Sequence, residues 1–144
     1  MLLRENDLAE AGTILIAVGD GVLADSLRFS LELEGFDVKL CDVKLCDEQS
    51  LLRAMEMNDA ARGCLVLDQD VFARIVEGNG DRRFAESGIP IVLMVGHKTE
   101  RVVARAEAAG VTRLVEKPLL GGVLFDAIRT AISGMPLRHA HRHS

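Results

Sequence analysis

Short apolar runs alternate with longer amphipathic stretches along most of this chain. Residues 13–18, TILIAV, form a run of aliphatic residues typical of a buried strand, and a Gly-Asp-Gly turn follows it. Beyond that turn Leu23, Leu27 and Leu31 recur every four residues, which places them on one face of a helix that Gly35 would end. The pattern therefore predicts a strand followed by a helix, which is one βα unit.

The same alternation repeats toward the end of the chain. Apolar runs at 64–67, 89–95 and 112–116 are each followed by a stretch compatible with a helix. Strands that alternate with helices pair in parallel, so we expect an α/β fold, a doubly wound five-stranded parallel sheet with five helices. The last helix carries the clearest apolar stripe, formed by Val123, Leu124, Ala127, Ile128, Ala131 and Ile132.

Between the first helix and the third strand the pentapeptide DVKLC occurs twice in succession, at 37–41 and at 42–46. Side chains of a strand alternate with a period of two, so an odd repeat places the apolar residues of the second copy on the opposite face. Two interpretations follow: a long strand buried on both faces, or one strand and then an excursion. We favour the excursion, because the cost of closing a loop grows slowly with its length.

Composition and charge exclude several classes of function. The formal net charge is −5, so the chain lacks the basic surface that nucleic-acid-binding proteins use. Charged residues follow the first two leucines directly, which leaves no apolar segment for a signal peptide or a membrane span. We therefore expect a cytoplasmic protein with no direct nucleic-acid partner and no membrane partner.

The length of 144 residues suits a single domain with one core. The expected boundaries are an N-terminal extension at 1–12, the domain at 13–133 and a flexible tail at 134–144. Alternate histidines in such a tail can bind a transition metal, but they more often have no function. In this tail they are His139, His141 and His143.

The three cysteines, Cys41, Cys46 and Cys64, are an odd number, and a reducing compartment disfavours a disulfide framework. Cys64 opens an apolar run, so we expect it to be a small buried residue. The alternative is a redox or metal sensor in which the cysteines hold a cluster, with His97 as a further ligand.

Charged residues occur where the predicted strands end. Asp20 follows the first strand, Asp68 ends the third and Lys117 ends the fifth, and the carboxyl ends of parallel strands form one rim where ligands bind. A carboxylate there can attack a phosphoryl donor, and a nearby ammonium group would neutralise the oxygens it acquires. Asp68 and Lys117 supply that pair, although Asp68 has the alternative role of a helix N-cap.

Magnesium ordinarily bridges carboxylate and phosphate oxygens in such chemistry, and it requires hard oxygen ligands in octahedral geometry. Asp20 and Asp70 are the candidate metal ligands, and Asp20 has the alternative role of capping the first helix. We therefore expect Mg²⁺ binding to be weak or lost.

Four segments resemble receiver domains of two-component response regulators: TILIAVGDGVLADSLRFSLELEGFDVKLC, GCLVLDQD, IPIVLMVGH and AEAAGVTRLVEKPL. The resemblance spans 13–132 and is similar in particular to the nitrogen-fixation and oxygen-signalling branch. It implies the flavodoxin-like receiver fold, Asp68 as the phosphoacceptor, Lys117 as the phosphate-contacting lysine, and a cis bond between Lys117 and Pro118. It also implies a histidine kinase or another two-component protein as the partner, and a homodimer through the fourth helix, fifth strand and fifth helix.

The resemblance breaks down around the expected acceptor. The family's acidic pair falls on Val18 and Gly19, and its two switch positions, a hydroxyl and an aromatic residue, fall on Val95 and Leu114. The Met-Pro and Gly of the loop after the acceptor have no counterpart in QDVFARIVEG. Because these departures cluster at one site, we expect a changed use of the pocket and a domain held in one conformation.

Three functions follow, and none is that of an enzyme, because no nucleophile, base and orienting group recur together. The first is a receiver without an output domain in which Asp68 accepts a phosphoryl group from a histidine kinase. The second is a phosphorylation-independent adaptor or inhibitor that docks on a kinase or a regulator through the face formed by the fourth helix, fifth strand and fifth helix. The cysteine-based sensor is the third.

Overall fold

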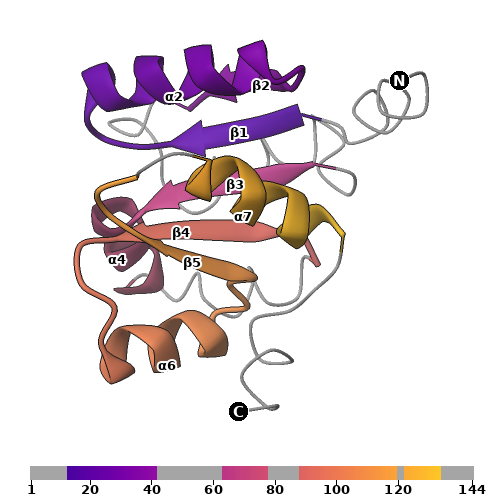
Figure 1. Ribbon diagram of the computed structural model, residues 1–144. Coiled ribbons are helices and arrows are strands. Elements are labelled where there is room, and N and C mark those ends of the chain that lie inside the picture. Colours follow the sequence, from indigo (N-terminus) through magenta and orange to yellow (C-terminus); the bar gives the residue numbers. More distant parts are fainter. Residues whose placement is uncertain (1–12, 42–62, 78–87, 120–121, 134–144) are drawn as a thin grey trace.

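The computed structural model describes residues 13–41, 63–77, 88–119 and 122–133 (Figure 1). The strands expected from the sequence are confirmed, with ends that differ by two residues at most. A fifth helix, expected between the second and third strands, falls at 42–62, outside the described residues. The elements are β1 Thr13–Ala17, α2 Gly21–Leu33, β2 Asp37–Leu40, β3 Cys64–Asp68, α4 Gln69–Glu77, β4 Ile91–Val95, α6 Glu100–Ala108, β5 Arg113–Glu116 and α7 Val123–Ile132.

The five strands form one parallel sheet in the order β2-β1-β3-β4-β5. Helices α2 and α7 cover one face of the sheet, and α4 and α6 cover the other (Figure 1). The chain crosses from β1 to β2 on one side and returns to β3 on the other side of β1, so the strand order reverses there. The expected doubly wound α/β fold is therefore confirmed, and its carboxyl edge next to β1 and β3 is where ligands bind in such sheets.

The three central strands are buried on both faces, and each has five buried residues in succession. Alternate residues belong to two separate apolar clusters: Ile14 and Ile16 face α2 and α7, whereas Leu15 and Ala17 face α4 and α6. Burial of one such aliphatic side chain contributes about 1.5 to 3 kcal/mol, so both clusters together supply the main stabilisation of the fold.

Strand β2 lies at the edge of the sheet and pairs with β1 from Asp37 to Leu40. The first DVKLC copy therefore forms this strand, with Cys41 directly after it. The second copy lies outside the described residues, so neither interpretation of the repeat is tested.

The expected end of the first helix at Gly35 is confirmed. Gly35 has a φ of 99°, in the left-handed region that glycine adopts without steric cost. The amide of Phe36 then donates to the carbonyl of Leu31 at 3.1 Å, which closes the helix. None of the described helices is long and apolar enough to cross a membrane.

We expect Gly63→Ala to lower the free energy of unfolding by about 2 kcal/mol, because a Cβ there would overlap the backbone carbonyl oxygen of Thr13 and push β3 away from β1. The matched control is Gly21→Ala, where a Cβ meets nothing within 4 Å. Urea unfolding followed by circular dichroism measures both variants, and equal stabilities would contradict the close approach of Gly63 to Thr13.

Candidate functional site

The candidate site is an ion pair at the carboxyl edge of the sheet. Asp68 is the last residue of β3 and only 8% exposed, and Lys117 directly follows β5. The Nζ of Lys117 lies 2.7 Å from the Oδ1 of Asp68. The structure thus brings together the two residues that the sequence singles out, and it has the expected cis bond between Lys117 and Pro118.

The carboxylate of Asp68 is incompletely satisfied. The contact with Lys117 has an ion-pair distance without hydrogen-bond angles, so Oδ1 has no hydrogen-bond partner among the described residues. The lysine side chain is 37% exposed, and water therefore screens part of its attraction. A carboxylate that is 8% exposed and pairs with one partly exposed ammonium group is costly to bury, which makes Asp68 a candidate functional residue.

Asp20 has a structural role. It precedes α2, and its Oδ1 accepts from the amides of Val22 at 3.0 Å and Leu23 at 3.2 Å. These bonds satisfy two amides that a helix start leaves without partners, as an N-cap does. The alternative role that the sequence offers for Asp20, a helix cap, is the one its hydrogen bonds fulfil.

The positions where the family has its acidic pair carry no acid here. Val18 is 4% exposed and belongs to the apolar cluster under α2 and α7, and Gly19 has no side chain to offer. Val95 is fully buried in the other cluster, and the half-buried Leu114 packs against that same cluster. The rim around Asp68 is therefore aliphatic where receivers are expected to have carboxylate, hydroxyl and aromatic groups.

The described residues do not fit a Mg²⁺ site. Nowhere in the described ranges do three or more His, Cys, Asp or Glu side chains come together. Asp70 is exposed on α4, Asp20 is turned toward its helix, and Asp68 faces an ammonium group. Among these described side chains a divalent cation would not find the several converging hard oxygens that it prefers.

Two side chains that sequence reasoning missed hold the loop between β4 and α6. Gln69, the first residue of α4, accepts at its Oε1 from the Gly96 amide at 3.0 Å, and Glu116, the last residue of β5, accepts at its Oε2 from the Lys98 amide at 3.0 Å. For Gln69 the sequence offered one signal, which is that no turn residues follow Asp68. The helix can therefore begin directly after the strand, and the side chain of Gln69 then stays at the carboxyl edge.

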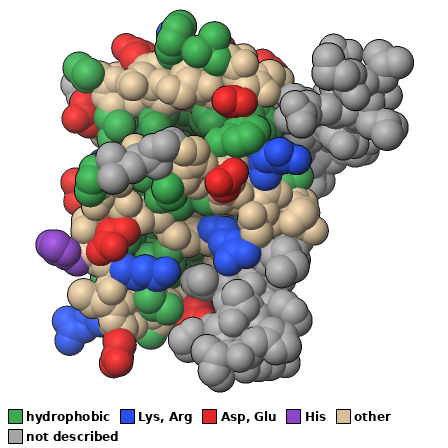
Figure 2. All heavy atoms as spheres, in the orientation of Figure 1, with side chains coloured by type: hydrophobic (Ala, Val, Ile, Leu, Met, Phe, Trp, Pro, Cys, Tyr) green, Lys and Arg blue, Asp and Glu red, His purple; other side chains and the backbone are tan. Residues whose placement is uncertain are grey.

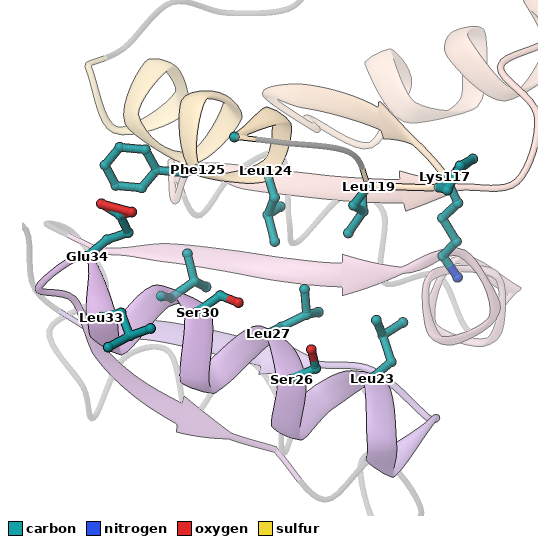
Figure 3. Close-up of a pocket in the computed structure, with 13 residues that line it drawn as sticks. Leu23, Ser26, Leu27, Ser30, Leu33, Glu34, Lys117, Leu119, Leu124 and Phe125 are labelled. Atoms are coloured by element: carbon teal, nitrogen blue, oxygen red, sulfur yellow. The ribbon is translucent and has the colours of Figure 1, made fainter.

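A groove of about 610 Å³ lies between α2 and α7 and runs to Lys117. Leucines of both helices line it, with Lys117 at one end and Glu34 and Phe125 at the other (Figure 3). Val22, Phe29 and Leu33 are 81%, 65% and 72% exposed on a single face of α2, and Leu33 also lines the groove. Hydrophobic side chains accordingly gather on the α2 side of the molecule (Figure 2).

The cysteines within the described residues lie apart. Cys41 packs against the cluster under α4 and α6, and Cys64 belongs to the cluster on the opposite face of the sheet. Strand β1 separates their strands, which puts them about 10 Å apart across the sheet alone. Burial raises the pKa of the Cys64 thiol to about 12, although a backbone hydrogen bond with Val92 opposes this, so the thiol stays protonated and inert at neutral pH.

The remaining candidate metal ligands do not form a metal-binding group within the described residues. His97 is exposed in the loop after β4. The three tail histidines, His139, His141 and His143, and Cys46 lie outside the described residues. The expectation that Cys64 is a small buried residue is confirmed, since its exposure is 1%.

Comparison with solved structures gives receiver domains of response regulators. A structure of FixJ-N is 26% identical over 85% of this chain and 94% of its own, with a TM-score of 0.65. Full-length FixJ from B. japonicum is 26% identical over 92% of this chain, with a TM-score of 0.66, and this chain covers 63% of it. A CheY-like receiver from Methanospirillum hungatei has a TM-score of 0.66 at 18% identity, over 85% of this chain and 94% of its own, which shows the fold alone.

The chain therefore has the receiver fold of two-component response regulators, as the sequence motifs imply. The FixJ structures among the matches confirm the expected resemblance to that branch in particular. No family model and no curated protein matches the chain.

We expect Mg²⁺ to bind more weakly than about 1 mM, because no three potential ligand side chains come together among the described residues and Asp68 already faces Lys117. The affinity for Mg²⁺ can be measured by isothermal titration calorimetry, or from the NMR chemical shifts of backbone amides near Asp68. Binding tighter than this would show that Asp20 or Asp70 turns toward the rim and would contradict the account given above.

Proposed function

We propose that this chain is a receiver-type signalling domain of a two-component pathway in which Asp68 is a slow phosphoacceptor. The observation that carries the proposal is the Asp68–Lys117 pair, 2.7 Å apart at the carboxyl edge of a receiver fold. A histidine kinase, or a phosphorelay protein that carries phosphohistidine, is the partner class that suits this chemistry.

In the proposed step a carboxylate oxygen of Asp68 attacks the phosphorus of a phosphohistidine. The phosphorus–nitrogen bond breaks, the imidazole leaves with the electron pair and takes up a proton, and Asp68 becomes an acyl phosphate. Lys117 would neutralise charge on the transferred group, since its ammonium already lies at the acceptor. The step is slow because no acidic pair holds a metal ion and Val95 has no hydroxyl to bind the phosphoryl group.

Incubation of the protein with acetyl phosphate and Mg²⁺, followed by intact-mass analysis, tests the acceptor. We expect slow, partial addition of one phosphoryl group that disappears in Asp68→Asn and persists in the matched control Asp70→Asn, whose carboxylate is exposed on α4. A label that survives in Asp68→Asn would assign the chemistry to another residue.

A second candidate is a phosphorylation-independent adaptor or inhibitor of a kinase or regulator. The aliphatic rim favours it, because a pocket without switch residues has no means of reporting phosphorylation. The apolar stripe Val22, Phe29 and Leu33 on α2 favours it further, since large exposed apolar groups beside a groove are typical of docking surfaces. The sequence leads us to expect docking and dimer contacts on the α6, β5 and α7 face. The exposed apolar side chains of α2 favour a docking surface on that helix instead.

Binding to purified histidine kinases of the same organism separates these surfaces. We expect Phe29→Ser to weaken the complex about tenfold or more, because it removes the largest exposed apolar side chain of the stripe. The control Val123→Ser, 46% exposed on α7, should bind like the wild type. The reverse result would return the interface to the α6, β5 and α7 face, and equal binding of wild type and Asp68→Asn would favour the adaptor.

The sensor hypothesis receives less support. A cluster needs its ligands within a few ångströms of each other, and Cys41 and Cys64 lie on opposite faces of the sheet. These two cysteines therefore do not ligate a common cluster, and a sensor would have to use residues outside the described ranges.

A further inference from the structure

The loop that joins β4 to α6 is bound by side chains on both of its sides. On one side the Gly96 amide donates a hydrogen bond to the side chain of Gln69. On the other side the Lys98 amide donates to the side chain of Glu116, and each bond is 3.0 Å long. Thr99 then caps α6 by accepting from Val102 at 3.2 Å. The backbone of this loop is thus tied to the ends of β3 and β5 as well as to its own helix.

The Gly96 amide lies at the same carboxyl edge of the sheet as Asp68. Asp68 pairs in register with Met94 on the neighbouring strand, so Gly96 lies just past the strand end beside it. Val95, which precedes Gly96 in the chain, is fully buried, and its side chain offers no hydrogen-bond donor. Gln69 already accepts the hydrogen bond of the Gly96 amide with an uncharged oxygen, so this amide has no free hydrogen to offer an oxygen attached to Asp68.

The start of α4 explains why Gln69 reaches this position. The helix begins at Gln69 with no residue between it and the strand that ends at Asp68. A longer connection would carry the side chain after Asp68 away from the rim. Here it stays within reach of the next strand end, and the Gly96 position is sterically open, since a Cβ there would meet nothing within 4 Å.

We propose that Gln69 is an internal latch, a positioning residue whose side-chain oxygen accepts the hydrogen bond of the Gly96 amide. This bond holds the loop 96–99 in one position whether or not Asp68 is modified. The inference deepens the proposed function and in that respect rests on Asp68 being the acceptor. It gives a physical cause for a domain with one conformation: the hydrogen bond that an added phosphoryl oxygen would form is already made from within.

The latch is tested in the unmodified protein by solvent exchange of the Gly96 amide, measured by nitrogen-15 NMR. Gln69→Met keeps the length of the side chain and removes its oxygen, and we expect exchange of this amide to become about three to ten times faster, as loss of one hydrogen bond allows. Gln69→Glu keeps an accepting oxygen and should restore the slow exchange. The Lys98 amide, held by Glu116, serves as an internal control and should change little.

An unchanged exchange rate of the Gly96 amide in Gln69→Met would overturn the latch. An exchange rate in Gln69→Glu as fast as that in Gln69→Met would overturn it too. Labelling with acetyl phosphate distinguishes this failure from that of the proposed function. Absence of label on Asp68 in every variant would contradict the proposed role of Asp68 as phosphoacceptor. The exchange rate of the Gly96 amide would still test the latch independently. If the latch holds and Asp68 is labelled, Gln69→Met should retain its phosphoryl group longer than the wild type, because the Gly96 amide is then available to it.

Discussion

Burial of β1, β3 and β4 on both faces is the constraint on which the rest of this structure depends. A strand covered on both sides has no solvent-exposed face, so every residue of these strands must be apolar or must lie at an end. Charged side chains are consequently found at the carboxyl ends, where Asp68 ends β3 and Lys117 follows β5. Their 2.7 Å contact is a consequence of parallel pairing, because parallel strands end at the same edge.

Most of the architecture could be predicted from the sequence. The apolar runs of the central strands are continuous and bounded by turn residues, and the leucine spacing of α2 and the stripe of α7 match the helical period. Edges of elements shifted by one or two residues, because the last turn or residue of an element is fixed by local hydrogen bonds rather than by periodicity. The residues 42–62, which hold the second DVKLC copy and the fifth expected helix, lie outside the described residues, so these two expectations are not tested.

The site was predictable in part, and the missing part has a physical cause. Position at strand ends and the receiver motifs identify Asp68 and Lys117, and the departures at Val18, Gly19, Val95 and Leu114 can be read from the sequence alone. The contacts of Gln69 and Glu116 cannot, because each joins two strand ends that are far apart in the chain. A helix that begins directly after Asp68 decides where Gln69 lies, and helix starts are the least certain feature of a sequence pattern.

The burial of Val18 has a consequence for how this chain relates to receivers that keep their acids. At 4% exposure its side chain is part of the cluster beneath α2 and α7. A carboxylate introduced there would have to leave that cluster or be buried without a partner, and either change is costly. The aliphatic side chain at position 18 is thus part of the core, and a carboxylate at this position would require the neighbourhood of β1 to be rebuilt.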